Sequence, residues 1–404
     1  MKRVLLVAAT TGYQVREFAE AARALDVELV LATDRCHILE NPWGDAAAAV
    51  RFEDPKAGIE ALASRGPFDG ILAVGDQPAC VAAEAAERLK LRFHPAEAAR
   101  AAANKLLSRE HFRAAGMLVP EFRRMPVAEP ATAGVRFPCV LKPLDSSASR
   151  GVIRANNREE FIAAAARIAR MQAHDQEKDL IVEDYIPGRE FALEGVVTAG
   201  KLQTLALFDK PDPLEGPYFE ETIYLTPSRE PLNVQRSIRE TAQAAVTALG
   251  LTDGPVHAEM RVNEHGVWIL EAAARPIGGL CARVLRFGAP HLTLEQLLLR
   301  HALGEDVSNA VLAPGSHGVM MIPIPHAGVY RGVQGLEDAR RIPGVEDIVI
   351  TAKEGQELLP LPEGSTYLGF LFVRDSSADL VLDGLGQAHE RLQFVFSAVL
   401  PVVK

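Results

Sequence analysis

The segment VHAEMRVNEHGVWILEAAARP places acidic side chains along two apolar-alternating runs that flank a turn. If residues 264–266 form a three-residue hairpin loop, Gly266 supplies the positive φ of a G1 bulge and Glu259 lies directly opposite Glu271. Directly opposed side chains share a face, with Cβ atoms about 4.5–5.5 Å apart. A loop of two or four residues would instead place the two acids on opposite faces.

Two carboxylates this close repel each other unless a cation lies between them or one is protonated. The two opposed residues are both carboxylates, which suit a hard ion such as Mg²⁺ or Mn²⁺. We therefore interpret Glu259 and Glu271 as candidate metal ligands. The alternative is an ordinary ion pair of Glu271 with Arg275 or Arg261.

A second candidate group follows the apolar strand FPCVLKP, which ends near Lys142. The next loop is DSSASRG, and its small residues are Ser146, Ser147, Ser149 and Gly151. Small residues let backbone N–H groups approach an anion, and a lysine adds a point charge. The spacing of a P-loop is missing, and a plain turn is the alternative for such a cluster.

Lys105 lies in an alanine-rich helical pattern over residues 96–117. By itself it would be a solvated helix lysine. Together with Lys142, the small-residue loop and the opposed acids, it completes a set that suits a phosphorylated ligand and its metal ion.

The elements that must position these residues begin with a βαβ series in residues 1–95. Strands are predicted at residues 4–9, 27–32 and 70–74, and helices at residues 15–24 and 79–89. This series predicts a small parallel sheet covered on both faces. The first strand ends in Thr10-Thr11-Gly12 without the G-x-G-x-x-G fingerprint, so a dinucleotide site there has weak support. Asp76 follows a strand at the edge where such sheets bind ligands, and a helix N-cap ahead of Pro78 is the alternative.

Further along, short strands alternate with helices predicted at residues 158–171, 232–249 and 292–303. Residues 209–228 are Pro-rich and acidic without periodicity, which indicates a flap. Residues 315–404 form a β-rich tail with Gly/Pro turns and a final helix predicted around residues 388–396.

The bulk composition limits the class of protein. A chain of 404 residues should form two to four compact units. Its net charge of -10, from 43 basic and 53 acidic residues, argues against a nucleic-acid partner. The absence of any run of 18 apolar residues predicts no transmembrane helix and no membrane partner. Four scattered cysteines suggest neither a zinc site nor a disulfide framework and fit a reducing cytoplasm.

From about residue 105 to residue 300, the chain resembles the ATP-grasp superfamily. The resemblance rests on the order of Lys105, VLKP, the Ser-rich loop, the segment VEDYIPGREFALEG, and the acid pair followed by Arg275. It implies that ATP lies between two α+β subdomains. The adenine would be lined by Glu183, Asp184, Tyr185 and Ile186, mainly through the backbone of the last three. Glu190 would hold the ribose hydroxyls. Lys105 and Lys142 would contact the phosphates beneath the closing 146–151 loop.

The expected fold class is therefore multidomain, α/β and α+β. Residues 1–95 would form an N-terminal parallel α/β domain of the pre-ATP-grasp type. Residues 96–185 would form a linker helix and the small ATP-grasp subdomain with the phosphate loop. Residues 186–305 would form the large subdomain with the metal and substrate site, and residues 306–404 a β-rich C-terminal domain.

Within the superfamily the chain is similar to the L-amino-acid ligases, which join unprotected amino acids into dipeptides. The similarity rests on EAAARPIGG, YFEETIYLTPS, and a tail containing PGVEDI and STYLGFLFV. Two departures stand out. Ala273 replaces an Asn that many ATP-grasp enzymes carry, and Asn104 precedes Lys105 where Asp is frequent. Losing the Asn removes one metal oxygen ligand, which water can replace because Mg²⁺ keeps several waters.

The resemblance implies an ADP-forming ligase that phosphorylates a substrate carboxylate and lets an amine attack the acyl phosphate. Arg275 would hold the carboxylate or the acyl-phosphate oxygens, and Lys142 would assist at the phosphates. The amides of Gly278 and Gly279 could form an oxyanion site.

Three further residues have both a functional and a structural interpretation. His257 shares the face of Glu259 and could touch the acyl group, or it could pack against a neighbouring strand. Glu220 or Glu221 in the flap could bind the incoming ammonium, or both could be solvated loop acids.

Two alternative functions are a purine-biosynthesis or biotin-carboxylase-like ATP-grasp ligase and a non-catalytic ATP-binding protein. The retained lysines, acids and Arg275 argue against the second. The expected partners are small-molecule amino acids, and a homodimer is compatible with the superfamily.

Overall fold

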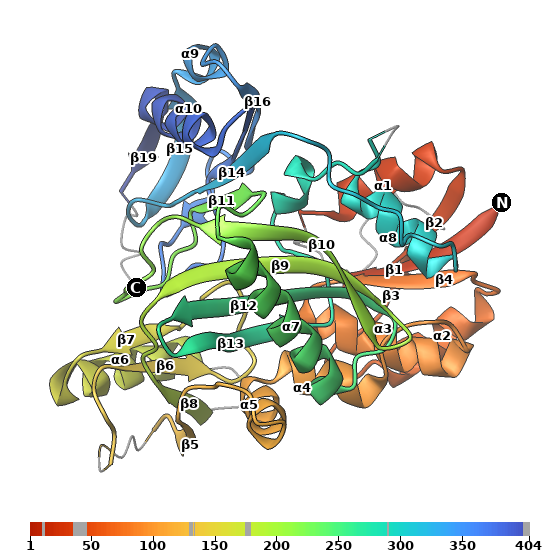
Figure 1. The fold of residues 1–404 in the computed structure, drawn as a ribbon, viewed down its shortest axis with the longest axis horizontal. Coiled ribbons are helices and arrows are strands. Elements are labelled where there is room, and N and C mark those ends of the chain that lie inside the picture. Colours follow the sequence, from red (N-terminus) through yellow and green to blue (C-terminus); the bar gives the residue numbers. More distant parts are fainter. Residues whose placement is uncertain are drawn as a thin grey trace, which may run out of the picture.

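The fold was analysed in a computed structural model, which describes residues 1–9, 13–34, 47–128, 132, 134–173, 179–288 and 291–398. These residues form four sheets flanked by helices (Figure 1). A small parallel sheet lies on one side, a long central sheet crosses the molecule, and a second small sheet lies below it. The C-terminal elements cover the remaining corner. None of the described helices is long and apolar enough to cross a membrane.

The N-terminal sheet has the order β3-β2-β1-β4, and all its pairs are parallel. Its strands are β1 (Lys2–Ala8), β2 (Val27–Thr33), β3 (Ala47–Ala49) and β4 (Gly70–Val74), with helices α1 (Val15–Ala24), α2 (Lys56–Ser64) and α3 (Asp76–Leu89). Five consecutive residues of β1 are buried, as expected for a parallel strand covered on both faces. The predicted parallel α/β arrangement is therefore confirmed, while Thr10-Thr11-Gly12 lie outside the described residues.

The predicted alanine-rich helix is two helices, α4 (Ala96–Ala103) and α5 (Lys105–Ala114). Asn104 breaks it because its backbone is extended, with φ -108° and ψ 116°. Its side chain accepts hydrogen bonds from the amides of Leu106 and Leu107, which makes it the N-cap of α5. Lys105 is therefore the first residue of a helix, and the prediction of one continuous helix was wrong.

A four-stranded antiparallel sheet of order β5-β8-β6-β7 carries the small-residue loop. Its elements are β5 (Phe122–Pro126), β6 (Cys139–Pro143), β7 (Ile153–Ala155), α6 (Arg158–Met171) and β8 (Asp179–Asp184). Phe161, Ala165 and Ile168 on one stripe of α6 are buried against this sheet. The loop between β6 and β7 thus extends from a packed layer.

The central sheet is antiparallel throughout and has the order β13-β12-β9-β10-β11-β14-β18-β16. Its first part contains β9 (Arg189–Thr198), β10 (Lys201–Lys210), β11 (Ile223–Thr226), α7 (Leu232–Leu249), β12 (Gly254–Asn263), β13 (Gly266–Ala273), a 3-10 turn (Cys281–Val284) and α8 (Leu294–Ala302). The same sheet continues through β14 (Ser316–Ile322), β16 (Val345–Ile350) and β18 (Gly369–Asp375). One sheet therefore runs across the predicted boundary at residues 305 and 306, and C-terminal strands extend the layer that carries the acids.

The last elements form a three-stranded sheet of order β17-β15-β19. They are β15 (Gly328–Gln334), α9 (Leu336–Arg340), β17 (Glu357–Leu358), α10 (Ala378–Arg391) and β19 (Gln393–Ser397). The final helix was predicted too late in the chain. It begins after Ser377, whose side chain accepts a hydrogen bond from the Leu380 amide, and the alternating segment QFVFS is a strand.

The hairpin of β12 and β13 pairs Glu259 with Glu271 as predicted, although the predicted loop was wrong. Asn263 pairs with Gly266, so the loop has two residues, and a regular ladder would place the acids on opposite faces. A bulge at Leu270 shifts the register by one residue and brings the acids opposite each other. The buried Arg109 donates to the Leu270 carbonyl at 2.7 Å and anchors this bulge.

The N-terminal domain packs on the first residues of β12 through His94. This side chain is 1% exposed, and its Nε2 lies 3.0 Å from the Pro255 carbonyl. Burial lowers the pKa of His94 to about 4 from the usual 6.5, and the hydrogen bond to Pro255 only partly offsets this effect. His94 therefore contacts β12 as a neutral imidazole.

We predict that His94 makes folding stability pH-dependent between its two pKa values. The unfolded chain binds a proton below pH 6.5, whereas the folded chain resists it down to about pH 4. Its contribution is therefore complete above pH 6.5 and falls by roughly 1.4 kcal/mol for each pH unit below that. Urea unfolding of wild type and His94→Gln from pH 7 to pH 4.5 should show a shallower pH dependence in the variant. Parallel curves would contradict the prediction.

Candidate active site

A cavity of about 360 Å³ lies where the N-terminal domain, the two middle sheets and the C-terminal elements meet. Most predicted site residues line it: Lys105, Lys142, Ser146, Ser147, Ser149, Glu183, Asp184, Tyr185, Ile186, Glu190, Glu221, His257, Glu259, Glu271, Arg275, Gly278 and Gly279. Two predicted residues, Gly151 and Glu220, do not line it. The structure thus brings together residues spread over some 175 positions of the chain.

At one end of the cavity, two cations meet the buried carboxylate of Glu183. Arg109 Nε lies 2.5 Å from one of its oxygens, and Lys142 Nζ lies 2.6 Å from the other. Burial would raise the pKa of Glu183, but these two cations lower it to about 2. Burial lowers the pKa of Lys142 from its usual value, and the negative charge of Glu183 offsets part of this decrease. Glu183 therefore fixes the orientation of the Lys142 side chain.

Lys105 is fixed beside the small-residue loop. Its ammonium donates to the Ser146 carbonyl, and its amide donates to the Leu144 carbonyl at 3.2 Å. The neighbouring Asn104 side chain donates to Asp145 at 3.1 Å. The start of α5 and the loop are thus tied together, which places both lysines at one end of the cavity.

The loop itself adopts an unusual backbone. Ala148 and Ser149 have φ values of 52° and 55°, and Gly151 has φ 73°. Consecutive turn conformations of this kind can turn successive N–H groups toward one side, as in anion-binding nests. A Cβ at Gly151 would lie 2.7 Å from Pro143 Cγ, so an alanine does not fit there. Gly151 therefore shapes the loop from outside the cavity.

We name the contacts of Arg167, Tyr218 and Glu363 the loop latch. Arg167 on α6 donates to both oxygens of Glu363 at 2.6 and 2.8 Å and also donates to the Tyr218 hydroxyl. Next to it, the Gly151 amide donates to the Pro362 carbonyl at 3.0 Å. The C-terminal segment thus holds the small-residue loop at Gly151, and Arg167 ties the flap residue Tyr218 to Glu363 in the same segment.

The predicted adenine wall has fewer free backbone groups than expected. The amides of Asp184 and Tyr185 already donate to the carbonyls of Glu121 and Pro138, and the Ile186 carbonyl accepts from Arg261 at 2.7 Å. In the described part of the chain the Ile186 amide has no such partner. Of the three backbone N–H groups predicted to contact adenine, only that of Ile186 therefore remains free in the described part of the chain.

The flap forms the opposite side of this wall. The Phe219 ring stacks on Tyr185 with centroids 6.4 Å apart, and the Arg261 guanidinium lies over both rings at 5.3 and 5.5 Å. Both Phe219 and Tyr185 line the cavity. An aromatic base would therefore meet a preformed stack of aromatic and guanidinium planes.

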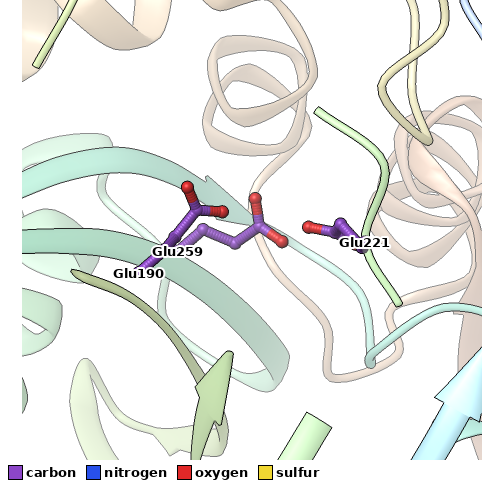
Figure 2. A group of neighbouring side chains, drawn as sticks. All are labelled: Glu190, Glu221 and Glu259. Atoms are coloured by element: carbon purple, nitrogen blue, oxygen red, sulfur yellow. The ribbon is translucent and has the colours of Figure 1, made fainter. Parts of the chain in front are cut away.

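At the centre of the cavity, Glu190, Glu221 and Glu259 converge so that one oxygen of each lies within 4.8 Å of the others (Figure 2). Lys210 Nζ occupies the space between them. It lies 2.9 Å from Glu190 and 2.9 Å from Glu259, and it also donates to Glu221. The positive charge that the three carboxylates share is therefore the Lys210 ammonium. Glu190, predicted for ribose, is also bound by Arg261 Nε at 2.8 Å.

His257 lies between two carboxylates and is 4% exposed. Its Nδ1 is 3.3 Å from Glu194, and its Nε2 is 3.4 Å from Glu259. Burial would lower the pKa of His257, but the two glutamates raise it to about 9. The ring is therefore an imidazolium at neutral pH, so it can contribute positive charge to the cavity but not act as a base.

Asp76, the first residue of α3, binds Arg275 and takes up part of its hydrogen-bonding capacity. Its Nε lies 2.8 Å and its second terminal nitrogen 3.5 Å from the two Asp76 oxygens, and the third nitrogen donates to Pro276. Glu271 is farther away, at 3.6 Å. Burial would raise the pKa of Asp76, but Arg275 holds it below its usual value. Of the five N–H donors of an arginine, these three bonds leave two for a ligand.

The backbone after Arg275 is clamped at Ile277. Its amide donates to Glu194 at 3.0 Å, and its carbonyl accepts from the Gln14 side chain. The amides of Gly278 and Gly279 have no bonded partner in the described part of the chain. The clamp therefore fixes two free N–H groups at the cavity, as an oxyanion site requires.

The charges of the cavity fit a divalent cation beside the opposed acids. Six carboxylates converge here, namely Asp76, Glu190, Glu194, Glu221, Glu259 and Glu271. Four cations face them, namely Lys210, His257, Arg261 and Arg275. Glu221 is only partly ionised near neutral pH, because burial and the neighbouring Glu259 raise its pKa to about 7. The side chains of Glu271 and Glu259 are 32% and 20% exposed and both line the cavity, whereas Ala273 is buried and has no side-chain oxygen.

Several residues of the site were missed by sequence reasoning. Arg109 follows Lys105 by four residues, so both lie on one helix face, and this spacing was an available signal. Lys210 ends an apolar run in the pair Asp-Lys, which gives a weaker signal. Gln14 and Tyr367 line the cavity from distant segments, and no local pattern marks them.

Comparison with known proteins agrees with this geometry. Residues 135–284 match the ATP-grasp domain, and residues 320–397 match the L-amino acid ligase C-terminal domain 2. The fold is similar to that of an L-amino acid ligase from Bacillus licheniformis, with a TM-score of 0.82, 22% identity, and 98% of this chain and 99% of that chain covered.

Two curated ligases are similar to part of the chain. The alanine–anticapsin ligase of Bacillus subtilis is 28% identical over 219 residues, which are 48% of this chain and 46% of that protein. The D-alanine–D-alanine ligase of Lacticaseibacillus casei is 27% identical over 183 residues, which are 43% of this chain and 48% of that protein. The match thus spans about half the length of each. The chain combines an ATP-grasp domain with a C-terminal domain of the L-amino acid ligase type.

We predict that the loop latch sets the affinity for ATP. Glu363→Gln removes the charge that Arg167 holds, so the small-residue loop should close less tightly and the KM for ATP should rise roughly 3–10-fold. Glu60→Gln is the matched control because Arg88 binds Glu60 in the same two-bond geometry, at 2.8 and 2.9 Å, far from the cavity. Equal KM values for both variants and wild type would contradict the prediction.

Proposed function

We propose that this ATP-grasp ligase joins two L-amino acids into a dipeptide and releases ADP and phosphate. The observation that carries the proposal is the contribution of the C-terminal segment to the cavity. Met321 and Tyr367, both within the matched L-amino acid ligase domain, line the same cavity as Arg275 and the opposed acids. A domain typical of amino-acid ligases thus forms one wall of the substrate region.

The remaining walls of this region suit an amino acid with an apolar side chain. Tyr13, Ile277, Cys281, Met321 and Tyr367 line it, and Arg275 and Gly278 lie beside them. The two free donors of Arg275 can hold a carboxylate in a planar fork. The C-terminal wall therefore favours an amino acid over a ribonucleotide or bicarbonate.

The nucleotide would extend from the Tyr185–Phe219 stack to the two lysines. Ile186 N–H would contact the base, Glu190 the ribose, and Lys105, Lys142 and the amides of the small-residue loop the phosphates. Glu259 and Glu271 would hold Mg²⁺ or Mn²⁺. Such an ion supplies charge neutralisation at the transferring phosphoryl group.

Phosphorylation of the carboxylate converts a poor acyl donor into a good one. In this chain Arg275 orients that carboxylate, and the amides of Gly278 and Gly279 face the oxygens on which charge develops. The protonated His257 contributes positive charge beside Glu259 and does not accept a proton in the reaction. Of the two flap acids, Glu221 lines the cavity, so it is the better candidate for the incoming ammonium, although Lys210 and Tyr224 already bind it.

We predict that Glu271→Ala lowers ADP formation about 100-fold or more without unfolding the protein. The side chain is 32% exposed and has one distant ion pair, so its loss costs little stability, whereas an accessible metal oxygen disappears. Glu264→Ala, in the loop of the same hairpin, is the control and should behave as wild type. Normal turnover of Glu271→Ala would show that the metal assignment is wrong.

The substrate class is tested by measuring ADP release with pairs of amino acids, followed by mass analysis of the products. We expect release to require two amino acids, with pairs that contain an apolar side chain most active, and to yield a dipeptide. Release driven instead by a purine ribonucleotide or bicarbonate would favour another ATP-grasp reaction. ATP binding with no amino-acid-stimulated release would indicate a non-catalytic protein.

A further inference from the structure

The ammonium of Lys210 is the feature of the cavity that neither the motifs nor the proposed reaction explains. Lys210 is the last residue of β10, and its side chain is 2% exposed. A buried lysine is stable only when carboxylates compensate its lost hydration. Here Glu190, Glu221 and Glu259 do so together.

The three acids come from three separate parts of the fold. Glu190 is opposite Lys210 in the β9–β10 ladder, Glu259 is on β12, and Glu221 is at the end of the flap. Figure 2 shows Glu190 and Glu259 reaching from one side and Glu221 facing them from the other. In the proposed function each acid has a different ligand, which is ribose for Glu190, the metal for Glu259 and the ammonium for Glu221.

Other groups bind only parts of this cluster. Arg261 takes the second oxygen of Glu190, His257 lies 3.4 Å from Glu259, and the Tyr224 hydroxyl donates to Glu221 at 2.8 Å. Lys210 is the one group in the described part of the chain that contacts all three acids. Without it, three carboxylates within 4.8 Å of one another would repel.

We propose that Lys210 is a positioning residue, a built-in cation that holds the three acids in the places their ligands require. Its single ammonium forms ion pairs both with Glu221 of the flap and with Glu190 and Glu259 on the strands. The same three oxygens form a geometry suited to a hard divalent ion, so the lysine also keeps such an ion out of this point. The assignment of ribose, metal and ammonium to the three acids rests on the proposed function, whereas the compensation of their charges by Lys210 does not.

Thermal unfolding of the whole chain, without nucleotide or amino acids, tests the proposal. The variants are Lys210→Ala, Glu221→Gln and the double variant, each measured with and without Mn²⁺. Lys201→Ala is the matched control because Lys201 is the exposed first residue of the same strand. Ligase activity is not measured, so an error in the proposed function cannot affect the result.

Three results are expected. Lys210→Ala should lower the Tm by several degrees, and Mn²⁺ should restore much of it by binding the vacated cluster. Glu221→Gln should lower the Tm of wild type, because it removes a partner of Lys210, but raise the Tm of Lys210→Ala, because it relieves repulsion. Lys201→Ala should match wild type in both conditions.

Two results would overturn the proposal. One is a Lys210→Ala protein whose loss of Tm is neither rescued by Mn²⁺ nor reduced by Glu221→Gln, which is the behaviour of a lysine that only fills space. The other is an equal Mn²⁺ response in wild type and Lys210→Ala. If Lys210→Ala does not accumulate as a folded protein, recovery of the double variant supports the proposal and its failure contradicts it.

Discussion

The central constraint in this structure is the burial of many charges of both signs at one junction. A continuous chain of ion pairs runs from Glu194 through His257, Glu259 and Lys210 to Glu190 and Arg261, and Glu194 also accepts a hydrogen bond from the Ile277 amide. Each charge is compensated by a neighbour from another strand or loop, so no single element can move without exposing an unpaired group. The cavity owes its preorganised charges to this network.

The architecture follows from the need to bring those charges together. The antiparallel pairing of β9, β10 and β12 aligns Glu190, Lys210 and Glu259, and the C-terminal strands extend the same sheet toward Tyr367. The N-terminal domain adds Asp76 to hold Arg275 and Gln14 to clamp Ile277. Each domain therefore contributes a positioning group, which explains why the cavity lies where they meet.

The sequence allowed prediction of the parts whose signals are local. Strand and helix patterns predicted the parallel domain, and the motifs that carry the ATP-grasp resemblance led to site residues, most of which line the cavity. Yet Glu259 and Glu271 face each other because of a bulge at Leu270, not because of the predicted loop. A bulge held by Arg109 from another helix leaves no local pattern. Lys210 was missed for the same reason, because its meaning depends on three acids that are distant in sequence.

In the reaction that we propose, the cavity activates a carboxylate by phosphorylating it. The most direct test uses an amino acid whose carboxylate carries heavy oxygen, supplied with ATP, a divalent ion and an acceptor amino acid. We expect one labelled oxygen to pass into the released phosphate, because the bond broken by the amine joins the acyl carbon to that oxygen. Unlabelled phosphate, or label found instead in AMP, would contradict it.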